Sequence, residues 1–350
     1  MTPLRIVLVL VLGTGLSDAL AEDGSGETAP LFASNNVLEV TLNAPFAKIM
    51  EDRSSDEEYP STLTYTDADA GEVSVELAVR TRGRFRRQPR VCEFAPLRLN
   101  IRKSTAKGTE FAKSDKLKLV THCHTGNKRY EQSLLAEYMA YRIFNLITDH
   151  SFRVRPLLIH YVDSDGIGED LEAFAFVIEH RDQLGKRIGL QQNEVPETEI
   201  ASLQAEHTNL VSLFQYLIGN TDFSPIRAAP GEPCCHNNML FGDTPGEIFV
   251  IPYDFDQSGI VNAPHGSPNP RFGLRNVRDR LYRGRCANNA HLDTSAQAFL
   301  DRKADIYALF EDHPGFNKPM LKQTTRFLNG FFETLEDPKR REARIAEKCL

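Results

Sequence analysis

The chain has 350 residues, of which 41 are Lys or Arg and 48 are Asp or Glu, so its formal net charge is −7. Hydrophobic residues make up 41% and charged residues 25% of the chain. This composition is ordinary for a globular protein and excludes a collagen, a coiled coil, a multi-pass membrane protein and a fully disordered chain. The acidic balance argues against general nucleic-acid binding, so we expect no nucleic-acid partner.

Residues 1–21 have the pattern of a signal peptide. Arg5 supplies the positive start, and residues 6–12 form an unbroken apolar run. Residues 19–21 then fit a small-x-small cleavage site. The apolar run is too short to span a bilayer, and no later stretch is long enough to do so. We therefore expect an exported protein, periplasmic or secreted, without stable membrane insertion.

Six cysteines follow the predicted signal peptide: Cys92, Cys123, Cys234, Cys235, Cys286 and Cys349. An even number in an oxidising compartment predicts disulfides, but six cysteines allow about 15 pairings and the spacing does not choose among them. We expect the neighbours Cys234 and Cys235 to have different partners. Metal binding through residues 122–124 or 234–236 is the alternative, although neither cluster has the spacing of a structural zinc site.

The first part of the predicted mature chain is rich in strands. Residues 22–35 are rich in Gly, Ser, Glu and Ala and are expected to form a flexible N-terminus. Period-two alternation then predicts strands at residues 37–42, 73–79, 97–101 and 117–119. A helical pattern over residues 131–147 and two further strand-like runs complete a β-rich N-terminal lobe that we place at residues 36–205.

The second part is mostly helical. Residues 209–218 have the pattern of a buried helix, and residues 248–253 that of an apolar strand paired with residues 239–241. Helices are expected again from about residue 296. We place a helical C-terminal lobe at residues 206–350, which makes the chain an α+β protein with two lobes.

A basic cluster follows the strand at residues 73–79. Its members on the chain are Arg80, Arg82, Arg84, Arg86, Arg87, Arg90, Arg98, Arg102, Lys103, Lys116 and Lys118. Guanidinium groups near a glycine turn suit a phosphate, because they can bind its oxygens bidentately. The alternative is a solvated basic edge that discourages pairing with another strand.

An acidic set lies in the second part of the chain. Asp222 follows the helix at residues 209–218, and Asn237 comes 15 residues later. Asp254 and Asp256 end the apolar strand and point to the same side of an extended segment. Two carboxylates and an amide suit Mg²⁺, and Asp222 could then deprotonate a hydroxyl. The alternative is that these residues only cap turns.

The basic and acidic groups occur along the chain in the order in which a kinase-like site uses them. Such a site needs sheet cations for the nucleotide phosphates, a loop Asp and Asn, and a second Asp at a strand end for the metal. Glu131 or Glu137, on the helix between the two groups, could pair with a strand cation. Ordinary salt bridging is the alternative for both.

The chain resembles atypical protein kinases of the spore-coat-protein-H (CotH) type, and uncharacterised exported bacterial proteins related to them, over roughly residues 70–262. The motifs that carry the resemblance are, in chain order, Arg82-Gly83, the strands at 97–101 and 117–120, the helix at 133–144, the strand at 174–179, the loop 218–222 and Pro252-Tyr253-Asp254-Phe255-Asp256. The resemblance implies a two-lobed protein-kinase-like fold, ATP with Mg²⁺ or Mn²⁺, and phosphoryl transfer to a hydroxyl of an envelope or secreted protein.

The resemblance also implies roles for single residues. Asp222 matches the catalytic-loop Asp. Asn237 matches the metal-binding Asn of that loop, with Asn238 the less favoured choice. Asp254 or Asp256 matches the metal-binding Asp.

On the nucleotide side, Arg98 or Lys118 takes the place of the phosphate-pairing Lys, and Arg82 belongs to the Arg-Gly motif. Tyr253 stands where the family has a Trp, so any adenine stacking by that Trp passes to Tyr253.

Two other functions use the same residues. Residues 250–258 fit an apolar strand followed by Asp-x-Asp-x-Ser, the nucleophile loop of haloacid-dehalogenase-type phosphatases, which would need further parallel strands. A non-catalytic module that binds a ligand, an ion or an envelope protein needs only the fold.

Overall fold

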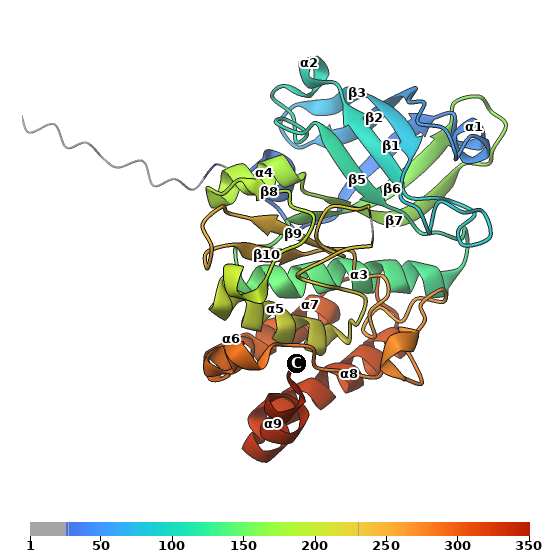
Figure 1. The fold of residues 1–350 in the computed structure, drawn as a ribbon. Helices are drawn as coiled ribbons and strands as arrows, with labels where there is room; N and C mark the ends of the chain where they lie inside the picture. The colour runs from blue at the N-terminus through green and yellow to red at the C-terminus, as the bar shows by residue number, and fades with distance from the viewer. Residues whose placement is uncertain (1–25, 27, 230) are drawn as a thin grey trace, which may run out of the picture.

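The computed structural model describes residues 26, 28–229 and 231–350, so the predicted signal peptide at residues 1–21 lies outside the described residues. Within them, seven strands close into a barrel in the order β1-β2-β3-β4-β5-β7-β6 (Figure 1). The strands are β1 (Leu38–Ala44), β2 (Tyr59–Asp67), β3 (Gly71–Thr81), β4 (Leu97–Ile101), β5 (Lys116–Val120), β6 (Val154–Asp163) and β7 (Leu171–Ile178).

The barrel closes through a parallel pairing between its first strand and a strand far along the chain. Leu38 of β1 lies opposite Leu157 of β6, and the register runs on to Ala44 opposite Asp163. The other neighbouring strands are antiparallel. Side chains alternate between a buried apolar interior and a more exposed outer face, as the period of two requires.

Helix α3 (Lys128–Ile147) lies between the barrel and the rest of the molecule (Figure 1). It packs against β6 and β7 on one side and against α7 on the other, so side chains all around its middle are buried. The side chain of Asn127 accepts a hydrogen bond from the Arg129 N–H and caps the start of the helix. This helix presents side chains from its own middle to the outer face of the barrel.

Two short helices, Phe46–Glu51 and Lys103–Ala106, and the turn Pro30–Phe32 contribute to the core of the barrel. The other remaining elements surround a second apolar core, to which α3 also contributes. A small sheet has the order β10-β9-β8. Its strands are β8 (Gln192–Asn193), β9 (Asn238–Phe241) and β10 (Phe249–Pro252). The other helices are α1 (Phe46–Glu51), α2 (Lys103–Ala106), α4 (Arg181–Ile188), α5 (Ala205–Ile218), α6 (Leu292–Asp301), α7 (Lys303–Glu311), α8 (Lys318–Glu336) and α9 (Pro338–Arg344). Short 3₁₀ turns lie at Pro30–Phe32, Ile200–Ser202, Pro270–Phe272, Cys286–His291 and Ala346–Lys348.

The predicted two-lobed protein-kinase-like fold, with a β-rich N-terminal lobe and a mostly helical C-terminal lobe, is wrong. The β-rich part is a closed mixed barrel, because β1 pairs with β6 and leaves no open edge between them. The part that follows includes the small sheet as well as helices. Period-two patterning identified strands correctly but does not say which strand pairs with which.

The cysteines form three disulfides: Cys92–Cys123, Cys234–Cys235 and Cys286–Cys349. Disulfides fit an exported protein, because they persist in oxidising compartments. The prediction that Cys234 and Cys235 have different partners is wrong, since these neighbours are bonded to each other. In the part of the chain that the structure describes, no helix combines the length and the apolar character that crossing a membrane requires.

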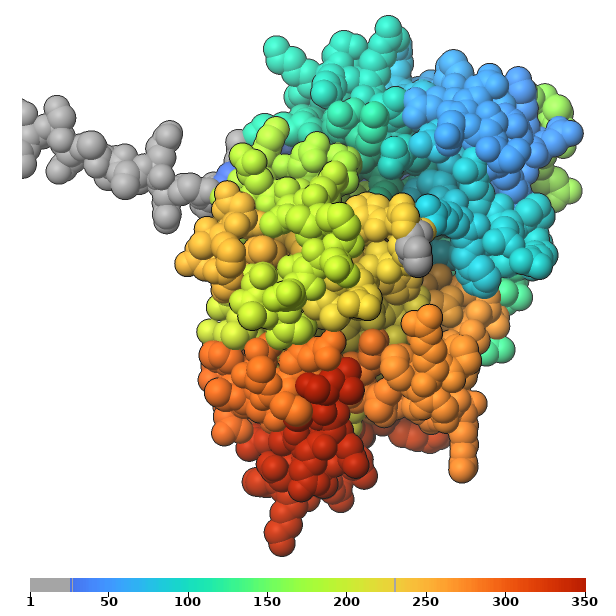
Figure 2. Space-filling model, viewed as in Figure 1, coloured from blue at the N-terminus to red at the C-terminus, as the bar shows by residue number. Residues whose placement is uncertain are grey.

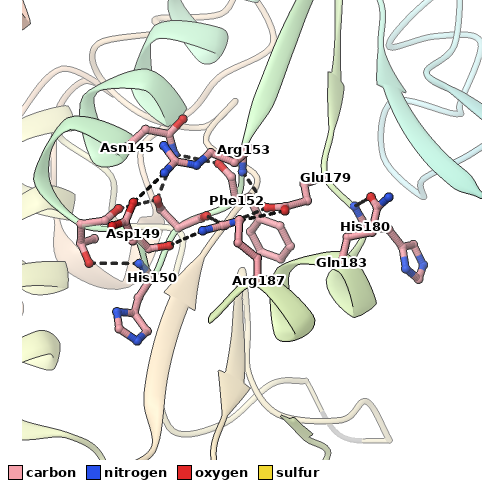
Figure 3. A network of polar contacts seen from close by, with 11 residues as sticks. Asn145, Asp149, His150, Phe152, Arg153, Glu179, His180, Gln183 and Arg187 are labelled. Carbon is pink, nitrogen blue, oxygen red and sulfur yellow. Dashed lines mark hydrogen bonds and ion pairs between the residues drawn. The ribbon is translucent and has the colours of Figure 1, made fainter. Parts of the chain in front are cut away.

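A buried ion pair joins β7, α4 and the turn between α3 and β6 (Figure 3). Arg187 donates to both carboxylate oxygens of Glu179 at 3.0 and 2.9 Å. The same guanidinium donates to the carbonyls of Asp149 and Ser151, and Glu179 also accepts the backbone N–H of Arg153. We call these residues the Arg187 clamp. It fixes the backbone on both sides of Phe152 and on one side of Ile178, and these two residues line the pocket described below.

Candidate functional site

A narrow pocket lies where the outer face of the barrel meets α3 and the end of β10. We call it the Lys118 pocket, and its polar lining consists of Arg82, Arg86, Lys118, Glu137, Tyr141, Tyr253 and Asp254. Its free volume is about 10 Å³, which is roughly the space that one water molecule needs. The pocket therefore holds a small group, such as one oxygen of a larger ligand, without rearrangement.

Two cations of the barrel face this pocket. Arg82 follows the end of β3, and Lys118 lies on β5 between Leu117 and Leu119, which point into the barrel. Among the described residues, neither cation lies within ion-pair distance of a carboxylate; Lys118 Nζ instead lies 4.8 Å from the centre of the Tyr253 ring. Burial, aided by the charge of Arg82, lowers the pKa of Lys118 to about 7. Asp254, which lines the same pocket, is the carboxylate whose charge acts on both cations. Positively charged side chains in a poorly solvated pocket suit an anionic ligand.

Arg86 lies among three carboxylates, one from α3 and two from the turn after β10. Its guanidinium is 3.2 Å from Glu137 Oε2, 3.3 Å from Asp256 Oδ2 and 3.5 Å from Asp254 Oδ1. Burial acts to lower the pKa of Arg86, but the three carboxylates, Glu137 first, raise it overall.

Burial also sets the protonation of the carboxylates around Arg86. It raises the pKa of Glu137 to about 8, against the opposing effect of Arg86. The pKa of Asp254 is raised by burial and by Asp256. Burial acts in the same direction on Asp256, but Arg86 and His265 hold its pKa below the usual range.

Asp222 lies beside this cluster and is held by two neighbouring residues. His236 Nε2 is 2.9 Å from Asp222 Oδ1, and the Asn237 amide donates to Asp222 Oδ2 at 3.1 Å and to its carbonyl at 2.7 Å. The Asn237 carbonyl in turn accepts the Tyr253 N–H at 3.1 Å. The hydrogen bond to Asp222, ahead of the opposing effect of burial, raises the pKa of His236.

Two residues of this region have left-handed backbone conformations. Asn237 has a φ of 51° and Asp254 a φ of 62°. Neither is glycine, so the surrounding structure must stabilise these conformations. The Asp254 N–H donates to the Tyr141 hydroxyl at 2.9 Å, which ties the end of β10 to α3. The structure thus joins Asp222 to Asn237, and Asn237 to Tyr253, the residue before Asp254.

Not every predicted residue lies at the pocket. The structure brings together Arg82, Lys118, Glu137, Tyr253 and Asp254 around it, with Asp256 behind Arg86 and with Asp222 and Asn237 next to it.

Two candidates do not line the pocket. Arg98 lies opposite Lys118 in the β4–β5 ladder, near Arg80 and Glu58 on the outer face of the barrel. Glu131 is in the first turn of α3, near Lys128.

Sequence reasoning missed four residues of the site, and one of them, Tyr141, was visible only as part of the helical pattern at residues 131–147. Arg86 was visible only as one member of the basic cluster, and nothing in its spacing set it apart from Arg84 or Arg87. His236 directly precedes Asn237, and this adjacency was a usable signal. His265 lies 3.3 Å from Asp256 Oδ2, but it belongs to a Pro-rich segment without a recognisable pattern.

The predicted metal ligands do not fit a resident Mg²⁺ or Mn²⁺ as they are placed. Arg86 lies against both Asp254 and Asp256, so a positive charge already lies beside the two predicted carboxylate ligands. Within residues 28–229 and 231–350, no group of three or more His, Cys, Asp or Glu side chains is arranged to hold a metal ion.

The segment between α5 and β9 meets the loop at residues 82–90, which we call the arginine loop, at the molecular surface. In Figure 2 the segment, in yellow, lies against the arginine loop, in cyan. Arg84 and Glu232 form an ion pair across this boundary.

Searches of protein-family models and of curated proteins found no match to this chain.

Proposed function

We propose that the Lys118 pocket binds the phosphate groups of a nucleotide such as ATP, and that the protein transfers a phosphoryl group to a hydroxyl of an envelope or secreted protein. The observation that supports this proposal is that Arg82 and Lys118 line one pocket with Tyr253 and Asp254, to which Asp222 is joined through Asn237. Phosphoryl transfer depends mainly on positioning and on charge stabilisation, and these are what such groups supply.

In the proposed step, the bond between the terminal phosphorus and the bridging oxygen of the nucleotide breaks, and the nucleoside diphosphate keeps the electron pair. A new bond forms between that phosphorus and the acceptor oxygen, whose proton passes to the carboxylate of Asp222. His236 and Asn237 fix the orientation of this carboxylate. Arg82 and Lys118 stabilise the negative charge on the phosphate oxygens.

The small free volume of the pocket favours a second candidate, a non-catalytic binding module. A space of about 10 Å³ admits one phosphate oxygen but not a whole nucleotide, unless the long side chains at its mouth move. The phosphatase alternative has no such support. It expects parallel strands beside the Asp-x-Asp loop, and β10 pairs antiparallel with β9.

The first test is ligand-dependent stability. We expect ATP or pyrophosphate to raise the Tm of the wild-type protein by a few degrees, because a ligand that binds only the folded state stabilises it. Arg82→Gln should lose most of this rise. Arg80→Gln is the matched control: it removes the same charge two residues earlier on β3, where Arg80 pairs with Asp56 outside the pocket. Equal responses of the two variants, or no rise in the wild type, would contradict the proposal.

Catalysis needs a separate measurement. Labelled ATP incubated with an envelope extract should give labelled protein with the wild type and a loss of at least tenfold with Asp222→Asn. A Tm rise without any transfer would assign the pocket to the binding module instead.

A further inference from the structure

Arg86 provides the strongest inference beyond the proposed function. Its side chain is 11% exposed, and its carboxylate partners Glu137, Asp256 and Asp254 are 2%, 11% and 40% exposed. The partners come from two places: Glu137 from the middle of α3, and the two aspartates from the turn after β10. One guanidinium therefore neutralises carboxylates that would otherwise repel one another in a poorly solvated space.

This is the position that a divalent cation would need. Mg²⁺ requires oxygen ligands at about 2.0–2.1 Å in octahedral geometry. The carboxylate oxygens around the pocket instead surround a planar guanidinium at 3.2–3.5 Å. A metal ion bound to the same oxygens would lie against the positive charge of Arg86, so the two cations compete for one place.

We infer that Arg86 takes the place of the divalent cation, so that this pocket binds phosphate groups without a metal ion. The inference rests on the proposed function for its ligand but not for the role of Arg86. Arg82 and Lys118 receive the phosphate oxygens from the barrel side. Arg86 neutralises Asp254 and Asp256, which would otherwise repel the same phosphate.

Two binding measurements on the wild-type protein test this inference. In the first, Mn²⁺ alone is titrated into the protein and free Mn²⁺ is followed by electron paramagnetic resonance; we expect no one-to-one binding in the sub-millimolar range. In the second, the Tm rise caused by ATP is compared in EDTA and in Mg²⁺; we expect the rise in EDTA to be at least as large. Tight one-to-one Mn²⁺ binding, or an ATP response that requires Mg²⁺, would overturn the inference.

Variants extend the test to Arg86 itself. Arg86→Gln leaves three carboxylates without their cation, so we expect it to gain Mn²⁺ binding of at least tenfold over the wild type. Arg87→Gln is the matched control, because the neighbouring Arg87 donates to backbone carbonyls of Arg53 and Ser55 outside the pocket. A folded Arg86→Gln that binds Mn²⁺ no better than Arg87→Gln would overturn the inference.

The experiments distinguish a failure of the proposed function from a failure of the role inferred for Arg86. If ATP stabilises the protein neither in EDTA nor in Mg²⁺, the nucleotide proposal fails, while the Mn²⁺ titrations still decide the role of Arg86. If Arg86→Gln does not fold by circular dichroism, Arg86→Lys replaces it. That variant keeps the charge but loses the planar contacts, and it should weaken the ATP response without gaining Mn²⁺ binding.

Discussion

Lys118 is a cation whose surroundings disfavour its charge. Burial removes water from the ammonium group, and Arg82 adds repulsion of the same sign. Arg98 and Arg181 act in the same direction, and Asp254 partly opposes them. The charge at this position therefore depends on whether an anion is present, because an anionic ligand favours the protonated form.

This dependence gives a pH prediction for ligand binding. The pKa of Lys118 in the folded protein is about 7, so above that pH the pocket must take up a proton to hold an anion with a charged lysine. We expect the Tm rise caused by pyrophosphate to be largest below about pH 7 and to fall as the pH rises.

Lys118→Met is the control for this pH effect, since it removes the titrating group. Its response to pyrophosphate should be small at every pH. A wild-type response that does not change between pH 6 and 9, or one that Lys118→Met reproduces, would contradict the role of this lysine.

Among the elements, the strands and the long helix were the most predictable from sequence. The alternation at residues 73–79 lies within β3, and the pattern at 131–147 ends with α3. The expected pairing of 239–241 with 248–253 is confirmed by the β9–β10 ladder. The positions of these strands and of the helix follow from local periodicity, and the tertiary structure agrees with it.

The closure of the barrel and the position of Arg86 could not be predicted in the same way. The β1–β6 pairing joins Leu38 to Leu157, and an edge strand shows the same alternation whichever partner it takes. Arg86 meets Glu137 and Asp256 only after distant parts of the chain come together. From the sequence alone, Arg84 and Arg87 are equally good candidates for this position in the site.

The Arg187 clamp supports a prediction about stability. Glu179→Gln should lower the free energy of unfolding by about 3–5 kcal/mol, because removal of one partner leaves a buried charge without compensation. The double variant Glu179→Gln, Arg187→Met should lose less stability for each residue replaced than Glu179→Gln alone. The second change removes the buried positive charge that the first leaves without a partner. Urea denaturation of the single and double variants measures both effects.

An exposed pair between α4 and the residue after β8 is the control for the clamp. Arg181 and Glu194 are 2.8 Å apart, with side chains 45% and 57% exposed. Glu194→Gln should change the free energy of unfolding by less than about 1 kcal/mol. If Glu194→Gln and Glu179→Gln lower the free energy of unfolding by similar amounts, burial does not determine how much the clamp contributes to stability.

At the scale of the whole molecule, the three disulfides constrain the chain to very different degrees. Cys286–Cys349 closes a loop of 63 residues around the last helices, and Leu350 beside it donates to the Gly284 carbonyl. Cys234–Cys235 joins neighbours and closes no loop of comparable length. Restriction of the unfolded chain grows with loop length, so these bonds should contribute unequally to stability.

We expect the double variant Cys286→Ser, Cys349→Ser to lose about 4 kcal/mol of stability, which is the chain-entropy value for a loop of this size. Cys234→Ser, Cys235→Ser is the comparison, and it should lose much less. The measurement is the denaturation midpoint of each oxidised protein. An equal loss in both variants would mean that loop closure does not govern these contributions.

The parallel pairing of β1 with β6 also decides how the chain can be shortened. A fragment that begins after Ala44 would lack β1, and the backbone donors and acceptors of both β2 and β6 would lose their partners along this strand. Strand edges with unpaired backbone groups form hydrogen bonds with other copies of the same chain. We therefore expect such a truncated chain to self-associate, so a monodisperse preparation needs β1.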